Sequence, residues 1–525
     1  MRIRTKVLPF AIASLLAVTP VFAQNTSSAI NGRVLGPKGQ PVVGATVIIV
    51  HVPSGTTRIV STNAQGIYNA QGLRVGGPFD VTVSKQGFKI TKNDHVYLKL
   101  AQTSTLGVQA RELSNVVVTA SSLSNIFQPD NKGLSTTITR SAINSLPATG
   151  RSLQDYVRLD PLVNITNPAR GEISALGQNS RYNNITIDAV PTNDPFGLEA
   201  GGMPSLGQPI SIDTISEINV STNNYNVTNA RNTGAQINAV TKSGTNDFHG
   251  SLYYVYLPKG WVGHGKYNQP FAGFNRKTTH GFTLGGPIVK NKLFFFVGYE
   301  KSKTAAPAPN IGIIGSGKAN IVNITPNELS QISSIAQGYG LPTGGAVAGA
   351  LNTDEKRYLA KIDWNITDNH RLSFRYDRVT SNLAVFPGFS TRYSGSVGLQ
   401  SNNYSQKRDF KNFVVNLYDD WSENFSTETS VSYGEYSRLP QLNAIAPLVV
   451  VHTQGRYDPA VILGTSTYYQ GNSLNTKTWT GFWAGTLFLG SHTVEFGADF
   501  PRNSYNNLFL PYYFGVYAFN TIADF

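Results

Sequence analysis

The sequence predicts a mainly β protein, and three observations carry that prediction. The 525 residues include 50 glycines, 27 phenylalanines and 25 tyrosines but only 14% charged residues, a composition typical of turn-rich β-structure with aromatic belts. After the N-terminus, no apolar run is long enough for a transmembrane helix. From residue 248 onward, apolar and polar side chains alternate over segments of about ten residues, as in strands that cross a membrane. We expect an N-terminal β-sandwich, then an α+β domain, then a partial antiparallel transmembrane β-barrel.

The first 23 residues predict export. Basic residues at positions 2, 4 and 6 precede an apolar core at residues 7–18, and Ala23 ends a small-residue exit. This order of charge, apolar core and small residue is that of a secretory signal peptide. We expect cleavage between Ala23 and Gln24, with a buried N-terminal helix as the alternative.

The net charge and the lack of catalytic and metal-binding motifs exclude several classes of function. The formal net charge of +13 would ordinarily raise nucleic acid as a partner. In an exported chain with scattered basic residues, we instead assign the excess to loops and the barrel lumen, with outer-membrane lipid head groups as a partner. The chain has no cysteine, its eight histidines are dispersed, and a near P-loop at residues 312–319 has Ala319 where Ser or Thr would hold magnesium. We predict no enzymatic activity, no cofactor or metal site and no nucleic-acid partner.

Residues 24–107 predict a small sandwich of short strands separated by turns. Turn chemistry is clearest at residues 63–66 and 76–78. The expected strands are 30–34, 45–50, 57–61, 79–84 and 96–100.

Four stretches of this segment resemble the carboxypeptidase regulatory-like domain, a transthyretin-like sandwich with a carbohydrate-binding-like fold. They are residues 30–34, 39–47, 62–68 and 85–88. Asn63 stands where the family usually has Asp, and this departure argues against an ion or turn role inherited from the family at that position. The sequence shows no aromatic platform for a sugar, so we expect a spacer or docking role.

Residues 108–131 form a linker with one β-rich segment. The segment is Ser114, Asn115, Val116, Val117, Val118, Thr119 and Ala120. Taken alone it is an ordinary strand, but its position between two domains of an exported chain makes it resemble a TonB box. Such a box adds a strand to the sheet edge of an energising protein through main-chain hydrogen bonds. The resemblance implies a TonB-type partner in the periplasm.

Residues 132–246 resemble the plug domain of TonB-dependent outer-membrane receptors. The matching runs are residues 151–156, 181–188, 215–220 and 234–250, and the last resembles the plug-to-barrel junction of the Oar-like subgroup. The resemblance implies a plug inside a β-barrel in the outer membrane of a Gram-negative bacterium, with the N-terminal domains in the periplasm.

Residues 247–525 carry the barrel pattern. In one segment Leu372, Phe374 and Tyr376 alternate with Ser373 and Arg375, which predicts a lipid face and a lumen face. Nine strands are expected, at 248–257, 278–287, 291–301, 355–366, 370–381, 403–421, 424–438, 475–489 and 491–502. Tight links alternate with long ones at 258–277, 302–354, 382–402 and 439–474. This alternation is typical of short periplasmic turns and long external loops.

The number of strands sets a limit on closure. A plugged barrel needs about 22 strands, whereas the pattern yields nine and a tenth near residues 508–519. A barrel of about ten strands is filled by its own side chains. We therefore expect an open, curved half-barrel around the plug, and a truncated gene or partial sequence. A non-functional fragment is an open alternative.

The predicted function is energised uptake of an unidentified extracellular ligand. A turn-rich segment follows a strand that ends near Ala189, and we expect it to form an apical ligand loop, with a plain structural turn as the alternative. Its residues are Thr192, Asn193, Asp194, Pro195, Phe196 and Gly197. A role in surface morphogenesis or protein export, as in Oar-like proteins, is the alternative function.

Overall fold

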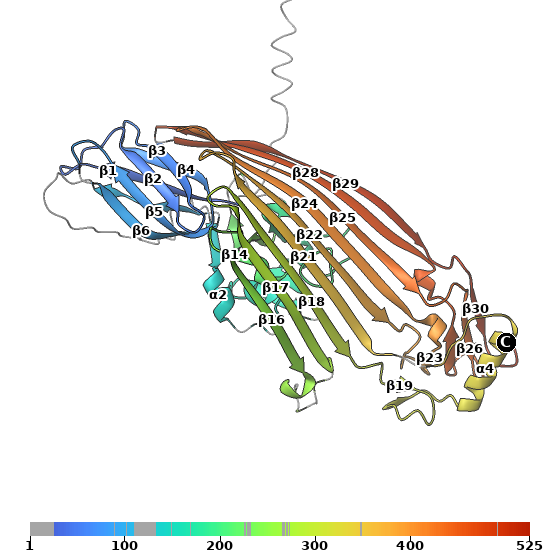
Figure 1. The fold of residues 1–525 in the computed structure, drawn as a ribbon. Helices are drawn as coiled ribbons and strands as arrows, with labels where there is room; N and C mark the ends of the chain where they lie inside the picture. The colour runs from blue at the N-terminus through green and yellow to red at the C-terminus, as the bar shows by residue number, and fades with distance from the viewer. Residues whose placement is uncertain are drawn as a thin grey trace, which may run out of the picture.

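The computed structural model describes residues 26–525 except 89, 101, 110–132, 147, 149, 169, 225–226, 228–232, 265–267, 269–270, 272, 347–348 and 491. An N-terminal sandwich lies at one end of a long nine-stranded sheet, a second domain lies against one face of that sheet, and a third folded unit lies at its far end (Figure 1). Within the described residues, no helix has the length and apolar character needed to cross a membrane.

Two sheets form the sandwich. The first contains β4 (Ile67–Leu73), β1 (Ser28–Leu35), β7 (Thr103–Thr105) and β8 (Val108–Gln109). The second contains β3 (Thr56–Ser61), β2 (Thr46–His51), β5 (Gly76–Ser84) and β6 (Thr91–Leu98). Every second residue of β2 is buried, as expected when one face of a strand meets the core. Ile30, Val47 and Phe79 belong to that shared core.

The sandwich matches most of the expected strands, with some corrections. Strands β4, β7 and β8 were not predicted, and residues 76–78, expected to form a turn, begin β5. The turn at residues 63–66 is confirmed. The side-chain oxygen of Asn63 accepts hydrogen bonds from the backbone N–H groups of Gln65 and Ile67 at 3.0 and 2.9 Å, so Asn63 supports the turn.

The second domain, called here the inner domain, spans residues 133–241. Its five-stranded sheet runs β13 (Val190–Pro191), β12 (Asn184–Ile187), β15 (Gln236–Thr241), β14 (Ile215–Asn224) and β9 (Gly133–Ile138). Around it lie the helices α2 (Arg140–Ser145) and α3 (Leu153–Val157) and the hairpin β10 (Val163–Asn167) and β11 (Glu172–Ala175). Every residue of β12 and β15 is buried. The apolar core of this domain extends to Phe296 and Leu359 of the nine-stranded sheet.

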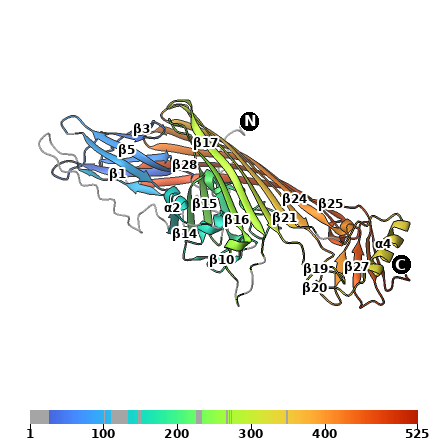
Figure 2. The same cartoon turned by 60° about the horizontal axis from the view of Figure 1, so that its bottom comes forward.

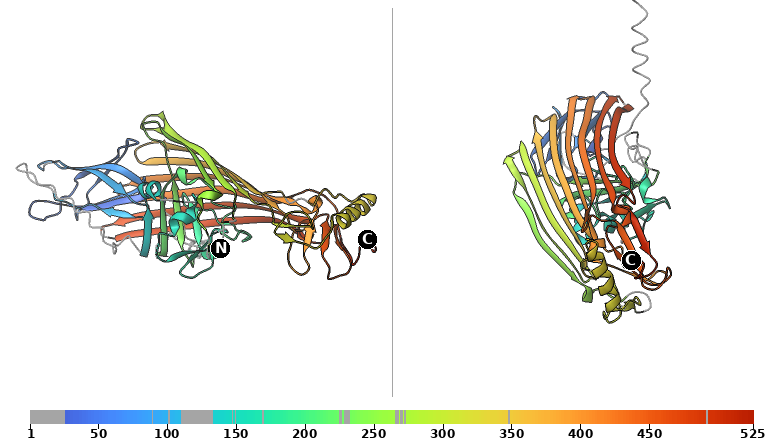
Figure 3. Two further views of the ribbon diagram at one scale, coloured as in Figure 1. Left: turned by 90° about the horizontal axis from the view of Figure 1, so that it is seen from below. Right: turned by 90° about the vertical axis from the view of Figure 1, so that its right-hand side faces the viewer.

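The nine-stranded sheet is antiparallel, and its strands lie in chain order. They are β16 (His249–Pro258), β17 (Arg276–Val289), β18 (Leu293–Ala306), β21 (Leu351–Asn365), β22 (His370–Val385), β24 (Tyr404–Ser422), β25 (Phe425–Leu442), β28 (Gly471–Leu489) and β29 (His492–Leu510). All nine predicted strands are confirmed. The sheet is curved and open (Figure 3), because within the described chain β16 and β29 each pair on one side only. The expectation of an open half-barrel is therefore confirmed for these residues.

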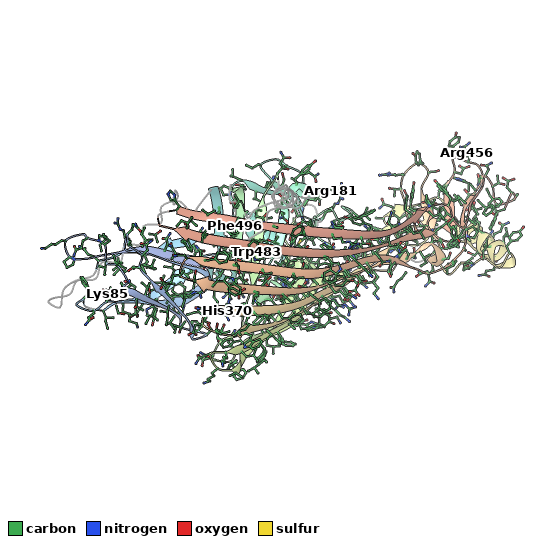
Figure 4. The ribbon with its side chains drawn as sticks, turned by 90° about the horizontal axis from the view of Figure 1, so that it is seen from above. Lys85, Arg181, His370, Arg456, Trp483 and Phe496 are labelled. Atoms are coloured by element: carbon green, nitrogen blue, oxygen red, sulfur yellow. The ribbon has the colours of Figure 1, made fainter. Side chains whose placement is uncertain are left out.

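The two faces of the sheet differ as the alternation predicted. On β22, Ser373, Arg375 and Asp377 are buried against the inner domain, while the side chains between them point to the other face. That outer face carries exposed aromatic residues, including Trp364, Phe413, Trp479, Trp483 and Phe496. Figure 4 shows Trp483 and Phe496 on the last two strands, which run side by side. An apolar outer face and a polar inner face are what a membrane-spanning strand requires.

The far end of the sheet holds a folded unit that was not predicted. It contains β19 (Ile311–Gly312), β20 (Asn320–Ile321), α4 (Pro326–Gly338) and a four-stranded sheet of β23 (Ser396–Gly398), β27 (Ala460–Leu463), β26 (Leu448–His452) and β30 (Val516–Phe519). Val397, Val451 and Ile332 belong to its own apolar core. This distal unit is built from three of the long connections and the C-terminal segment (Figure 2). The proposed tenth barrel strand was wrong, because β30 pairs with β26 in this unit and not with β29.

Cysteine pairs would test the register of β16 and β17, the first two strands of the nine-stranded sheet. Ser251 faces Thr283 across β16 and β17, with 2.7 Å between the two hydroxyl oxygens. We expect Ser251→Cys with Thr283→Cys to form a disulfide on oxidation, seen as a mobility shift in non-reducing electrophoresis, since the chain has no other cysteine. Ser251→Cys with Leu284→Cys is the matched control and should stay reduced, because neighbouring residues point to opposite faces. Cross-linking of the control pair alone would show a one-residue slip.

Candidate functional site

The inner domain contacts the nine-stranded sheet through three buried polar clusters. Each cluster is named after its central carboxylate, which is Asp188, Glu300 or Glu199. All three carboxylates are buried, and each accepts hydrogen bonds across the boundary between the inner domain and the sheet. A buried charge is tolerated only when it is paired and hydrogen-bonded, so these clusters define where the inner domain lies.

The Asp188 cluster joins the end of β12 to β21 and β22. Asp188 accepts hydrogen bonds from the backbone N–H and the hydroxyl of Thr241 at 2.8 and 2.6 Å. Arg375 donates through Nη1 to Asp188 Oδ2 at 2.7 Å and to the carbonyl of Ile187 at 2.8 Å. Its Nε donates to Asp377 at 2.8 Å. Lys361 lies 4.0 Å from the same Asp188 oxygen, so two cations surround one carboxylate.

These neighbours determine the protonation of Asp188. Burial by itself raises the pKa of a carboxyl group. Here Lys361, Arg375 and the hydrogen bonds from Thr241 outweigh burial and lower the pKa of Asp188 to about 2. Asp188 therefore stays ionised at any pH at which an outer-membrane protein works, and its attraction to the sheet persists.

The Glu300 cluster joins residues 208–211 to β16, β18 and β21. Glu300 Oε2 accepts hydrogen bonds from Ser211 and Tyr253 at 2.8 and 2.9 Å, and Glu300 Oε1 accepts one from Arg357 at 2.9 Å. Arg357 Nε also donates to the carbonyl of Gln208 at 2.9 Å. The inner domain is thus held here by the hydroxyl of Ser211, the carbonyl of Gln208 and the side chain of Arg151, which lies 4.0 Å from Glu300 Oε2.

The Glu199 cluster lies on β24 and β25. Arg408 Nε and Tyr436 Oη donate to Glu199 Oε1 at 2.7 and 2.8 Å, and Arg438 lies 3.4 Å from the same oxygen. Glu199 follows the predicted ligand loop at residues 192–197. The position of that loop is therefore fixed to the sheet from its C-terminal side.

The predicted ligand loop is well ordered by its own hydrogen bonds. Asn193 accepts from the backbone N–H of Ile185 and donates to the carbonyl of Asn183. Asp194 accepts from the N–H groups of Phe196 and Glu199. These contacts are those of a structural turn.

The same loop also lies against the edge strand of the sheet. Phe196 packs on Tyr505 of β29, with ring centroids 5.8 Å apart, and Tyr505 donates to the carbonyl of Pro195 at 3.3 Å. Asn193 and Pro195 line a cavity of about 260 Å³ together with residues of β24, β25, β28 and β29. The loop therefore borders a partly open cavity between the inner domain and the sheet.

The sandwich contacts the tight-turn end of the sheet through a separate set of polar contacts. Arg58 forms an ion pair with Asp420. Asn365 at the end of β21 donates to Thr56 at 3.1 Å and accepts from Arg74 at 3.2 Å. The turn between β17 and β18, residues 290–292, lies beside the chain that enters β16, since Asn246 and Asn291 exchange two hydrogen bonds of 2.6 and 2.7 Å.

Two predicted sites fall outside the described residues. They are the TonB-box segment, residues 114–120, and the signal cleavage site at Ala23 and Gln24. Sequence reasoning did not assign the three clusters. The sequence pattern that could have indicated them is the alternation on β22, in which the polar residues Ser373, Arg375 and Asp377 share the inward face.

A family model decides the class. The model described as "Outer membrane beta barrel domain" matches residues 240–525, more than half of the chain. The chain belongs to this outer membrane beta-barrel family. A second model, "Carboxypeptidase regulatory-like domain", matches residues 29–111, which confirms the resemblance of the sandwich. The protein is therefore assigned to the outer membrane of a Gram-negative bacterium.

One curated protein and two solved structures are similar to this chain. The "TonB-dependent transporter Oar" of Myxococcus xanthus is 28% identical over 378 residues, which are 69% of this chain and 34% of the relative. The outer membrane transporter YddB from Escherichia coli matches in structure with a TM-score of 0.52 and 13% identity, over 70% of this chain and 48% of that one. The siderophore receptor PirA from Acinetobacter baumannii has a TM-score of 0.47 and 17% identity, over 71% of this chain and 48% of that one. The chain thus spans about a third of the length of the curated relative and about half of these solved chains.

Removing the charge of Asp188 should loosen the inner domain. Asp188→Asn leaves Arg375 buried beside a neutral amide, and removing one partner of a buried ion pair costs about 3–5 kcal/mol. We expect hydrogen exchange in β12 and β15 to speed up by at least a hundredfold, measured by mass spectrometry on the whole chain in detergent micelles. Asp94→Asn, which removes an exposed partner of Lys92, should leave exchange unchanged.

The wild type should show the same loosening in acid. The pKa of Asp188 is about 2, against 3.8 for an ordinary aspartate. A depressed pKa stabilises the folded state above the ordinary value, and this stabilisation is lost as pH falls toward 2. Protection of β12 that is identical at pH 5 and pH 2.5 would contradict the role given to Asp188.

Proposed function

We propose that this chain acts as a TonB-dependent outer-membrane receptor that imports a ligand, with the inner domain as its plug. The observation that carries the proposal is the polar attachment of the inner domain to the inner face of a membrane-type sheet. Ion pairs and hydrogen bonds at Asp188, Glu199 and Glu300 hold it. Contacts of this kind can be exchanged for contacts with water as the domain shifts, whereas a continuous apolar interface could not.

The orientation follows from the connections. The tight turns and the sandwich share one end of the sheet, which we assign to the periplasm. The long connections and the distal unit share the other end, which we assign to the outside. In this arrangement the sandwich is the transthyretin-like domain predicted from sequence, and residues 247–525 supply the transmembrane strands.

The energising step follows from the place of the linker. The predicted TonB box, residues 114–120, lies between β8 and β9 in the chain. Strand β9 is the edge of the inner-domain sheet and pairs only with β14 among the described strands, from Gly133 opposite Asn224 to Ile138 opposite Ile218. A pull on the linker therefore acts first on β9, and it can separate this edge strand from β14 before any other strand of the inner domain.

The ligand site is proposed at the outer end of the inner domain. The loop at residues 192–197 borders the 260 Å³ cavity and contacts the edge strand β29. The Glu199 cluster lies directly behind it and links the loop to Arg408 and Tyr436. A ligand that displaces the loop would therefore also disturb the hydrogen bonds of Glu199 that hold the inner domain to the sheet. The chemical class of the ligand is not assigned by these residues.

A surface or export role is the second candidate function. The distal unit favours it, because this unit has its own apolar core at the end assigned to the outside and offers an ordered surface to other molecules. Deletion of the gene separates the two functions. Loss of growth on one nutrient with unchanged cell-surface features supports uptake, whereas altered surface features with normal nutrient use support the second candidate.

The TonB box gives the sharpest test of the first candidate. We expect Val117→Pro to weaken binding of the purified periplasmic domain of a TonB-type protein by at least tenfold in a titration with the whole chain. Proline removes a backbone donor in the middle of the added strand. Val117→Ile keeps that donor and should bind like the wild type. Equal binding by the proline variant would show that the TonB-type protein contacts another segment or does not bind this chain.

A further inference from the structure

A large cavity lies where the sandwich, the inner domain and the nine-stranded sheet meet, and it is called here the junction cavity. Its volume is about 460 Å³. His51 and Arg74 line it from the sandwich, Glu217 and Lys242 from the inner domain and the segment that follows it, and Arg371 from β22. The cavity lies at the tight-turn end of the sheet, and none of the residues 192–197 of the predicted ligand loop lines it. Any role of this cavity is therefore separate from ligand capture at the outside.

Positive charge exceeds negative charge around the junction cavity. Six lysine and arginine side chains line it, against three carboxylates, Asp188, Glu217 and Asp363. The cationic residues are Arg74, Lys99, Arg140, Lys242, Lys361 and Arg371. Asp188 is already occupied by Arg375 and Thr241, and Asp363 lies 3.8 Å from Arg74. Arg140 is paired with Asp213, which does not line the cavity, so the other five cations face the three lining carboxylates and part of their positive charge has no counter-ion in the lining.

The cations lie close enough to repel one another. Burial and the positive charges of Arg74 and Arg371 together lower the pKa of His51 to about 3. Burial lowers the pKa of Arg74 to about 10, and Arg371 adds to this while Asp363 opposes it. Burial and then Arg140 lower the pKa of Lys242 to about 8. Like charges gathered around one space are stabilised when an anion enters it.

Two of these cations also have unused hydrogen-bond donors. The Lys242 side chain makes no hydrogen bond or ion pair with any residue that the structure describes. Arg74 is 7% exposed, and its Nε is buried without an acceptor among the described residues. Its Nη2 is used, since it donates to Asn365. A buried donor without an acceptor, such as Arg74 Nε, is costly, whereas Lys242 is half-buried; a multivalent oxyanion supplies several acceptor oxygens to both side chains at once.

We propose that the junction cavity is a binding site for a small multivalent oxyanion, a phosphate or a polycarboxylate, held by Arg74, Lys242 and Arg371. Arg74 lies in the sandwich, Lys242 directly follows β15 of the inner domain, and Arg371 lies on β22, so the bound anion joins the sandwich to the end of the inner domain and to the sheet. The anion thereby favours the docked position of the sandwich. Glu217 opposes binding, since its second carboxylate oxygen is buried without a hydrogen-bond partner in the described residues and would face the anion.

Titration calorimetry on the whole chain in detergent micelles tests this site. The probes are sodium phosphate and sodium citrate, each compared with sodium chloride at the same ionic strength. We expect saturable binding of one equivalent of phosphate or citrate and no saturable heat from chloride. Tighter binding of phosphate assigns a phosphate ligand, and tighter binding of citrate assigns a carboxylate ligand. Absence of saturable binding for both overturns the proposal.

Three variants locate the site. Lys242→Gln should weaken binding at least tenfold, because it removes a charged donor that no described residue uses. Lys85→Gln is the matched control, since Lys85 lies on the sandwich away from the cavity (Figure 4), and it should bind like the wild type. Glu217→Gln should bind several-fold more tightly, and this gain does not depend on a variant that loses stability. Wild-type affinity in Lys242→Gln, or weaker binding in Glu217→Gln, overturns the assignment.

Discussion

The position of the inner domain depends on one electrostatic constraint, which is the pairing of two buried charged side chains, Asp188 and Arg375. The two residues are 4% and 1% exposed, and an unpaired charge in such a place is far more costly than the pair itself. The turn after β12 can therefore lie only where Arg375 and Lys361 meet it. The clusters at Glu199 and Glu300 repeat this arrangement on other strands. Together they specify a single position of the inner domain, and they do so with contacts that water can replace once the domain begins to move.

The alternation of side chains along the nine-stranded sheet provides both an apolar face for the membrane and a polar face that binds the inner domain. Its outer face carries aromatic and aliphatic side chains, and its inner face carries the arginines, lysine and carboxylates that hold the inner domain. A slip of one residue in any strand would exchange these faces and would place Arg375 or Asp377 in the apolar environment. The register of β21 and β22 therefore fixes both the membrane-facing surface and the attachment of the inner domain.

The sequence predicted those features that have a local signal. The alternation of apolar and polar side chains and the tight turns predicted all nine strands of the large sheet, and the turn residues predicted most of the sandwich. The distal unit was missed because its strands are short and its elements come from connections that are distant in the chain. A local signal was present at Thr325 and Glu328, which cap α4 reciprocally. The polar clusters could not be predicted, because Asp188 and Arg375 are 187 residues apart and only the folded chain brings them together.

The central claim is that the inner domain leaves its polar attachment when a TonB-type protein pulls on the chain. Ser211 tests it directly, since it is buried against Glu300 and Tyr253 and Ser211→Cys is nearly isosteric in a chain without cysteine. The measurement is the reaction of this cysteine with a water-soluble maleimide in cells, with and without an uncoupler that abolishes the proton gradient. We predict labelling in energised cells and protection in uncoupled cells or in cells without the TonB-type protein. Labelling that is equal in all three conditions would contradict the account.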